Sequence, residues 1–238
     1  MFKRGKGHGP EDQEDHWIPL SDLMTGLMMI FLLVAVSYMT DMELANYRIK
    51  RIAVRYNEVH DALYRDLEKE FKNDLPRWGA EIHRDLSIRF REPDVLFATG
   101  SDALKPRFQA ILNDFFPRYV AILSSPKYRK SISEIRIEGH TSSFWNRSVS
   151  ASSDDAYFRN MALSQARTRT TLAYVLGLPS VSGKKEWLKG LLTANGLSSS
   201  RLIYDKNGKE DPALSQRVEF RVRTDAASRI ARILEVSQ

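Results

Sequence analysis

The stretch WIPLSDLMTGLMMIFLLVAVSYMT, residues 17–40, determines how the whole chain is organised. Its only side chain with a full charge at neutral pH is that of Asp22. At about 1.5 Å per residue, a helix of this length extends roughly 36 Å and crosses the roughly 30 Å hydrocarbon core of a bilayer. We therefore predict a single transmembrane helix over residues 17–40, preceded by a short charged tail at residues 1–16.

Asp22 is the first candidate functional residue. A carboxylate near the centre of a membrane helix costs on the order of 2.5–3.5 kcal/mol, so it usually faces protein or water and serves a function. The alternative is that Ser21 and Asp22 cap a helix that starts at Leu23 and still spans the membrane. Pro19 favours the first interpretation, because proline is common at the first helical position and would place Asp22 about one turn inside the helix.

Small and polar residues share one face of this helix with Asp22. On a helical projection, that face contains Asp22, Thr25, Gly26, Met29 and Leu33. Its threonine and glycine suit close helix packing better than lipid contact. One span cannot enclose a carboxylate unaided, so other transmembrane helices are required, from copies of this chain, another protein, or both. We predict that Asp22 carries an ion and that Thr25 and Gly26 face a pore.

Composition limits the class of protein. The 238 residues carry a formal net charge of +6, which permits nucleic acid, anionic lipid or an anionic polymer as a partner. The lysines and arginines lack an RNA-binding or helix-turn-helix frame, so we expect no nucleic acid partner. The sequence has no cysteine, and its five histidines show no ligand spacing. We therefore expect no metal site, no cofactor and no catalytic residue, and we do not expect an enzyme.

Residues 41–76 are predicted to continue the membrane helix as a helical linker. Apolar residues recur there at steps of four and three, a heptad pattern that predicts a parallel homodimer. The alternative is that this apolar stripe packs on the domain that follows. Basic residues lie on both sides of the span, so the positive-inside rule does not orient it. The stripe consists of Ala45, Ile49, Ile52, Tyr56, Val59 and Leu63.

The order of strand and helix patterns over residues 77–238 predicts an α+β domain in which helices cover one face of a sheet. Alternating apolar residues predict strands, and longer periodic patterns predict helices. The predicted strands are residues 86–91, 135–139, 202–204 and 217–223. The predicted helices are residues 106–123, 158–176, 184–194 and 226–236, and a serine-rich loop is predicted at residues 142–155.

Motifs at both ends of the chain resemble known families. The span, with Trp17, then Asp22-Leu23-Met24-Thr25, resembles the ion-carrying helix of MotB-type stator subunits, in which the matching aspartate takes up the coupling ion. The soluble part resembles the OmpA-like peptidoglycan-binding domain of the same subunits, which is an α/β sandwich. The motifs that carry this second resemblance are FATGSDALKP at 97–106, EGHT at 138–141, N-x-x-L-S-x-x-R at 160–167 and RVE at 217–219.

Within that group, the span is most similar to the ZorB family of Zorya anti-phage defence systems. This resemblance implies a dimer of the chain inside a pentamer of multi-span subunits that are ZorA-like and therefore similar to MotA. The coupling ion of such a complex would be a proton or, alternatively, a sodium ion. The resemblance also implies a bacterial inner-membrane location with a cytoplasmic N-terminus and a periplasmic domain. The alternatives are a flagellar MotB-type stator subunit, a passive OmpA-like wall tether without ion coupling, and a TolR- or ExbD-like coupler.

The resemblance further implies a peptidoglycan-binding site, with one departure from the family pattern. Ser142 stands where family members carry an aspartate that grips the amino group of the stem peptide's diamino acid. Either Asp154 or Asp155 replaces that acid, or binding is altered. The guanidinium of Arg167 offers a planar fork of N–H donors that matches a carboxylate. The terminus of a stem peptide presents such a carboxylate. The candidate wall-binding residues are Thr141, Ser142, Asn160, Arg167 and Arg217.

For four of these residues, the alternative interpretation is a purely structural role. Thr141 and Asn160 would then only brace the site. Arg167 would be an ordinary charge on a helix surface, and Arg217 would pair with Glu138 or Glu219.

Overall fold

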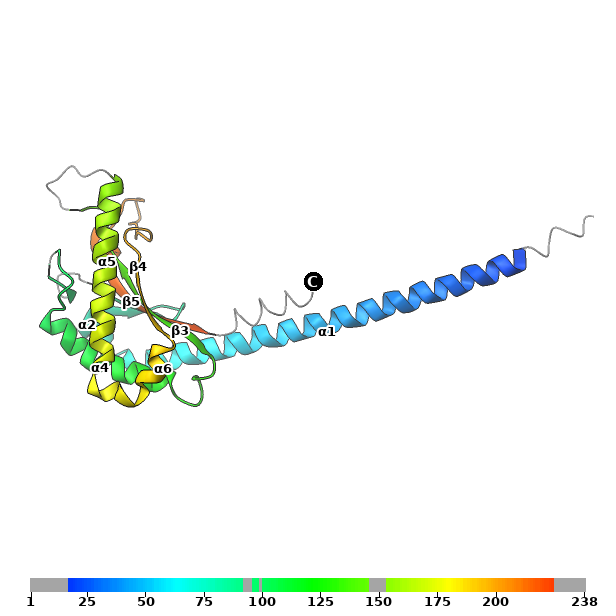
Figure 1. Cartoon of the computed structure of the whole chain (residues 1–238), viewed down its shortest axis with the longest axis horizontal. Helices are drawn as coiled ribbons and strands as arrows, with labels where there is room; N and C mark the ends of the chain where they lie inside the picture. The colour runs from blue at the N-terminus through cyan, green and yellow to red at the C-terminus, as the bar shows by residue number, and fades with distance from the viewer. Residues whose placement is uncertain (1–16, 92–95, 99, 146–152, 225–238) are drawn as a thin grey trace, which may run out of the picture.

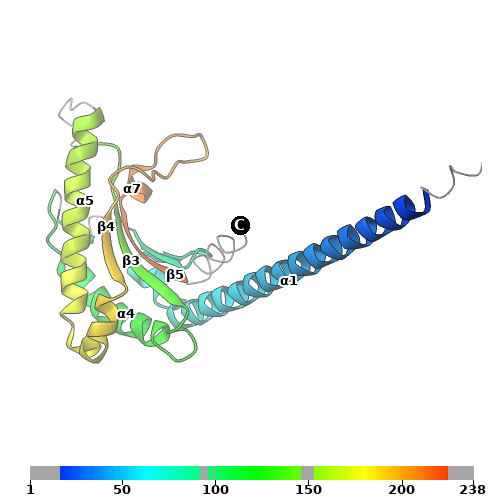
Figure 2. The same ribbon diagram turned by 45° about the vertical axis from the view of Figure 1, so that its right-hand side comes forward.

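The computed structural model describes residues 17–91, 96–98, 100–145 and 153–224. A long helix, α1, leads into an α/β domain and projects far beyond it in both views (Figures 1 and 2). The predicted tail at residues 1–16 and the predicted helix at residues 226–236 lie outside the described residues. The α+β fold with one N-terminal apolar helix is as predicted.

Helix α1 spans Trp17–Phe71 and contains 55 residues. Ser21 and Asp22 lie inside it, so the interpretation in which they cap a later helix start is wrong. Every side chain from residue 20 to residue 44 is exposed in the isolated chain. Among the described residues, one helix is long and apolar enough to cross a membrane, over Leu20–Arg51. An apolar surface of this size requires lipid or other helices around it.

The C-terminal end of α1 belongs to the core of the domain. Leu63, Leu67 and Phe71 are fully buried, and Val59 packs against the same core. These positions are four residues apart and therefore lie on one face of the helix. The last part of the predicted stripe thus packs on the following domain, which is the alternative to dimerisation.

Ala45 and Ile49, the membrane-proximal residues of the stripe whose side chains the structure describes, are not part of the core. Ala45 and Ile49 are partly exposed, and the side chains of Ile52 and Tyr56 lie outside what the structure describes. Dimerisation through this part of α1 stays a prediction.

The domain is built on a five-stranded sheet in the order β1-β2-β5-β3-β4. Neighbouring strands are antiparallel, except that β3 and β4 are parallel. The strands are β1 (Ala80–Ile82), β2 (Ser87–Phe90), β3 (Ile132–His140), β4 (Leu192–Gly196) and β5 (Arg217–Thr224). The helices are α2 (Leu75–Trp78), α4 (Pro106–Leu123), α5 (Ser153–Leu176), the 3-10 helix η1 (Pro179–Lys184), α6 (Lys185–Lys189) and α7 (Pro212–Ser215).

Alternation along the strands gives the sheet one apolar and one charged face. Ile88, Phe220 and Ile137 are neighbours across β2, β5 and β3, and all three are fully buried. The ring of Phe115 in α4 packs against this face, 5.1 Å from the ring of Phe220. Helix α5 lies along β3 and β4 (Figure 2). The core of the domain therefore lies between the sheet, α4, α5 and the end of α1.

The predicted helix at residues 184–194 is wrong, because α6 ends at Lys189 and a strand, β4, follows. β4 pairs in parallel with β3 and lies against α5. A Cβ on Gly196 would come within 2.3 Å of the backbone of Gln165, so the strand and helix approach closely only because glycine is present. Pairing with distant segments, rather than the local apolar pattern, makes this stretch a strand.

The structure also departs from the predicted elements in three smaller ways. The predicted strand at residues 202–204 is only an isolated bridge between Tyr204 and Glu210. Strand β1, which the apolar pattern does not indicate, pairs with β2. The predicted loop at residues 142–155 ends earlier than expected, because Asp154 and Asp155 lie in the first turn of α5.

Candidate functional site

The five predicted wall-binding residues gather at one end of the sheet. Thr141 and Ser142 follow the last residue of β3, and Arg217 is the first residue of β5, paired in register with the end of β3. Asn160 and Arg167 come from α5, seven residues apart and therefore on the same helix face. The fold thus brings three distant motifs to one place.

A narrow cavity lies at this end of the sheet. Its volume is about 10 Å³, which is room for about one water molecule. Arg167 of α5, Arg217 of β5 and the buried His140 of β3 all line it. A larger ligand must therefore bind over its mouth. The other lining residues are Leu96, Phe97, Gly139, Ser164 and Val218.

Arg167 is only 8% exposed, so it is not an ordinary surface charge. Its Nε donates to the carbonyl of Ser101 at 2.9 Å, and its Nη2 donates to the carbonyl of Ala98 at 3.4 Å. The guanidinium also lies 4.9 Å from the ring centroid of Phe97. Burial lowers the pKa of Arg167, and the charge of Asp102 opposes this change. Because a guanidinium has five N–H donors, three remain without a protein acceptor among the described residues.

Asn160 and the residues after β3 form a braced loop. Asn160 is 3% exposed, and its Nδ2 donates to the carbonyls of Ser142 at 3.1 Å and Phe144 at 3.3 Å. The backbone N–H of Thr141 donates to the carbonyl of Ser198 at 2.9 Å. Ser142 is buried, and its hydroxyl donates to the carbonyl of Phe144. These contacts brace the loop, and Ser142 offers no charge to a ligand; whether Thr141 and Asn160 also contact a ligand stays a prediction.

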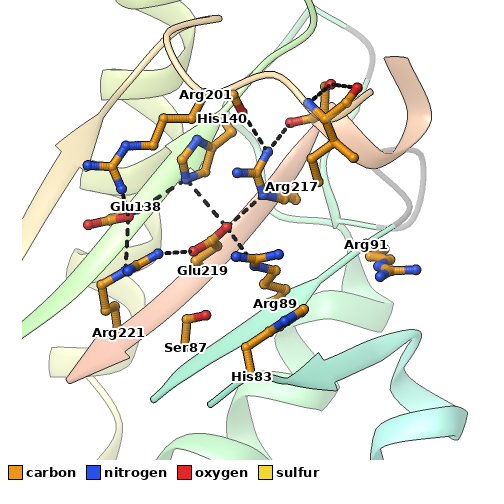
Figure 3. Close-up of polar contacts among 12 residues, drawn as sticks. His83, Ser87, Arg89, Arg91, Glu138, His140, Arg201, Arg217, Glu219 and Arg221 are labelled. Atoms are coloured by element: carbon orange, nitrogen blue, oxygen red, sulfur yellow. Dashed lines mark hydrogen bonds and ion pairs between the residues drawn. The ribbon is translucent and has the colours of Figure 1, made fainter. Parts of the chain in front are cut away.

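Charged side chains cover the face of the sheet opposite the helices (Figure 3). Glu219 is fully buried, and its Oε1 lies 2.6 Å from Arg217 Nε and 2.9 Å from Arg89 Nε. Its Oε2 lies 2.9 Å from Arg221 Nη2. Burial alone would raise the pKa of Glu219, but the surrounding basic side chains hold it below its ordinary value. Arg217 therefore pairs with Glu219, as the structural alternative for this residue predicts.

His140 and Glu138 extend this charged cluster (Figure 3). His140 Nε2 lies 3.8 Å from Glu138 Oε2 and 3.7 Å from Glu219 Oε1. Burial, together with the charge of Arg217, lowers the pKa of His140, so the imidazole is neutral at pH 7. Burial would raise the pKa of Glu138, but the nearby imidazole of His140 and the charge of Arg221 outweigh this effect and lower that pKa.

Three members of this cluster have the spacing of metal ligands. Atoms of Glu138, His140 and Glu219 lie within 4.8 Å of one another. The two carboxylates, however, already face three arginines, whose positive charges exceed their own negative charges. A divalent cation would add to that excess in a buried site, which is strongly unfavourable. Charged residues at alternate positions of three strands are the feature of the sequence that could have indicated this ion-pair cluster.

No family model matches the chain. The chain is 45% identical over 233 residues to the Zorya protein ZorB of Escherichia coli strain Crooks, a match that covers 97% of each protein. The chain belongs to the ZorB family. A second Zorya protein ZorB, from Escherichia coli O139:H28, is 26% identical over 223 residues, which are 91% of this chain and 83% of that protein.

Among solved structures, the ZorB-family chain is similar to a MotB-like protein from Desulfovibrio vulgaris. The two are 26% identical, with a TM-score of 0.46, over 70% of this chain and 95% of that one.

In this ZorB-family chain, neither Asp154 nor Asp155 lies near Arg167. Both are exposed in the first turn of α5, twelve or thirteen residues before Arg167, which is roughly 18–20 Å along the helix. Asp155 pairs instead with Arg159 at 2.9 Å. Groups so far apart cannot hold the amine and the carboxylate of one amino acid. Neither aspartate therefore lies beside Arg167, and whether one of them replaces the family aspartate or binding is altered stays a prediction.

The membrane segment of the ZorB-family chain presents a second candidate site, around Asp22. Among the described residues, Asp22 has no hydrogen bond or ion pair. The hydroxyl of Thr25 donates to the carbonyl of Ser21 at 2.7 Å, within the same helix. Apart from α1 itself, nothing lies within 4 Å of a Cβ built on Gly26. This face is therefore open to another helix, and a pore-facing role for Thr25 and Gly26 stays a prediction.

Proposed function

We propose that this chain is the wall-anchored, ion-carrying subunit of an inner-membrane rotary motor in anti-phage defence. The observation that carries the proposal is the continuity of α1, which holds Asp22 in its apolar part and Leu63 in the core of the domain. Between Thr40 and Val59 this helix extends roughly 30 Å. It therefore connects an acid in the membrane to a domain well outside it. Membership of the ZorB family supports the defence role over a flagellar one.

In this proposal Asp22 takes up the coupling ion, a proton or alternatively a sodium ion. The open face of α1 around Asp22 leaves room for helices of a MotA-like multi-span partner, and a dimer of this chain would present two such acids. An ionised carboxylate is costly in apolar surroundings, so Asp22 keeps its ion bound there and releases it where water reaches the side chain. Moving one charge through the membrane potential yields about 2.3 kcal/mol per 100 mV. That energy would rotate the partner subunits around the anchored dimer.

Peptidoglycan would bind over the mouth of the cavity at the end of the sheet. The three unused N–H donors of Arg167 form a fork that matches the terminal carboxylate of a stem peptide. The loop braced by Asn160 forms the neighbouring rim. Wall binding requires the domain to lie in the periplasm, which places the N-terminus in the cytoplasm.

Purification of the full-length chain in detergent with its multi-span partner tests the motor. We expect particle images in which copies of this chain lie inside a ring of multi-span subunits, with Asp22 facing those subunits. A chain that purifies without such a partner, or with Asp22 facing lipid, would overturn ion coupling and leave a passive wall tether.

Substitution of Arg167 tests wall binding. Arg167→Lys keeps the charge and removes the planar fork, so we expect sedimentation of the full-length protein with purified sacculi to weaken roughly tenfold. Arg169→Lys is the matched control, because Arg169 is exposed on the same helix. Equal sedimentation of the two variants would contradict the site.

A further inference from the structure

Glu210 is a carboxylate beside the candidate wall-binding site that the family motifs do not include. It lies in the segment between β4 and α7, which runs past the end of the sheet where β3 ends (Figure 2). Its Oε1 accepts a hydrogen bond from the backbone N–H of Ser143 at 2.9 Å, and its Oε2 accepts one from the hydroxyl of Ser143. The side chain is partly exposed, so a ligand can reach it.

The charge of Glu210 is not neutralised within the part of the chain that the structure describes. No lysine, arginine or histidine there lies within 4.0 Å of its carboxylate. Glu138 and Glu219, at the same end of the sheet, instead face arginines on the charged side of the sheet. Glu210 therefore offers an unpaired negative charge at the rim of the site, whereas these two glutamates do not.

Hydrogen bonds connect Glu210 through the braced loop to α5, the helix that carries Arg167. Ser143, which holds Glu210, directly follows Ser142, whose carbonyl accepts from Asn160. Asn160 precedes Arg167 by seven residues on the same face of α5, a distance of roughly 10 Å along the helix. About three residues of extended peptide span that distance. A short peptide with its carboxylate at Arg167 can therefore extend its free amine to the Asn160 end of this face, where the braced loop holds Glu210.

We propose that Glu210 binds the free primary ammonium group of the diamino acid in the peptidoglycan stem peptide, while Arg167 binds a carboxylate of the same peptide. This inference rests on the wall-binding function proposed above. Ser142 carries no charge, and Asp154 and Asp155 are remote from Arg167 along α5. The acid that the family places directly after β3 is thus supplied in this chain from a different segment.

Binding of a soluble muropeptide to the full-length chain in detergent tests the proposal. Two forms of the probe are compared: one with the free amine of its diamino acid, and one with that amine acetylated. Acetylation removes the positive charge and leaves the carboxylate for Arg167. We expect the wild-type chain to bind the free-amine form at least tenfold more tightly, the effect of one hydrogen bond to a charged group. Glu210→Gln should lose that preference and bind both forms about as weakly as the wild type binds the acetylated form.

Two further variants separate the charge from the structure of the loop. Ser143→Ala removes one hydrogen bond of Glu210 and keeps its charge, so the preference for the free amine should remain. Asp154→Asn removes a charge at the far end of α5 and should also keep it.

Each outcome decides between the two proposals. A Glu210→Gln variant that still prefers the free amine would overturn the role of Glu210, as would a wild-type chain that binds both forms equally. The wild-type comparison needs no variant, so it holds even if Glu210→Gln does not fold. If the wild-type chain binds neither form, the wall-binding function itself fails, and the role of Glu210 fails with it.

Discussion

The two ends of α1 carry similar side chains in opposite surroundings. At the membrane end, Phe31 is 64% exposed, and Asp22 has no partner among the described residues. At the domain end, Phe71 is fully buried, and Asp66 accepts a hydrogen bond from the hydroxyl of Tyr128 at 2.5 Å. The chain itself therefore provides packing and hydrogen-bond partners for the side chains at the domain end. The side chains at the membrane end need lipid or other proteins as partners.

Because of this difference, we expect substitutions at the two ends of α1 to have different effects. Removing contacts at the domain end should lower the free energy of unfolding, because those contacts lie within the chain. Substitutions at the membrane end should leave the domain equally stable and should change only what α1 does with lipid and partner helices. The predictions below test this separation, beginning with the largest expected effect.

Asp22→Asn should abolish phage protection. The amide keeps the shape of the side chain but cannot take up and release an ion, so the variant should still assemble with its partner. The measurement is plating efficiency of phage on cells that carry the complete system, with co-purification to establish assembly. Asp41→Asn is the matched control, because Asp41 lies on the same helix beyond the predicted span. Full protection by Asp22→Asn would refute ion coupling through this residue.

Phe71→Ala should destabilise the domain by about 3–5 kcal/mol, the usual cost of removing a buried aromatic ring. The ring of Phe71 packs 5.2 Å from Phe115 and 5.9 Å from Trp78, so its loss leaves a cavity between α1, α4 and α2. Denaturant unfolding in detergent measures the change. Phe31→Ala, at the membrane end, should leave the same transition in place. A shift of similar size in both variants would remove the distinction between the two ends.

The parts of the fold that could be predicted are those with strong local patterns. Pro106 and the apolar face that follows it predict α4 with both its ends. The stretch that forms β4 contains Thr193, Asn195 and Gly196, so it has neither clear alternation nor β-branched enrichment. It is a strand because β3 and α5 provide its partners, and a local pattern does not contain that information.

The candidate site likewise has residues that the sequence identifies and contacts that only the tertiary structure shows. The motifs identify Asn160 and Arg167, and helical periodicity places them on one face of α5. The partner of Arg217 depends on the register between β2, β5 and β3, which local sequence does not determine. Glu210 lies 67 residues after its partner Ser143, and only the tertiary structure brings them together.

Arg118 connects the domain end of α1 to α4, and its removal should cost about 1–3 kcal/mol. Its guanidinium lies 2.7 Å from Glu70, 2.9 Å from Asp74 and 3.0 Å from Asp114. Arg118→Ala therefore removes the cation that contacts all three carboxylates, and only the exposed Arg77 still faces Asp74 and Asp114. Thermal or denaturant unfolding measures the loss.

Arg77→Ala is the matched control for Arg118→Ala, because Arg77 contacts two of the same carboxylates but is 68% exposed. Its removal should cost less than about 1 kcal/mol, as for most exposed ion pairs. Equal losses in the two variants would show that solvent screens the contacts of Arg118 just as strongly.

The smallest expected effect is a dependence of domain stability on pH. The pKa of His140 lies below its ordinary value of 6.5 because of burial, so the unfolded chain takes up a proton at higher pH than the folded chain does. Stability should therefore be fully present above about pH 6.5 and should fall as the pH drops below it. The lowered pKa values of Glu138 and Glu219 add a further loss below about pH 4.5, their ordinary value.

His140→Gln should reduce the slope of unfolding free energy against pH between about pH 6.5 and pH 5, where the histidine contributes most. The slope should not vanish, because burial also lowers the pKa of His83. Comparing slopes rather than absolute stabilities removes the cost of altering a buried site. An unchanged slope would mean that the folded domain protonates His140 as readily as the unfolded chain. The charged face of the sheet would then tolerate an additional positive charge, and the argument against a cation bound by Glu138, His140 and Glu219 would lose its basis.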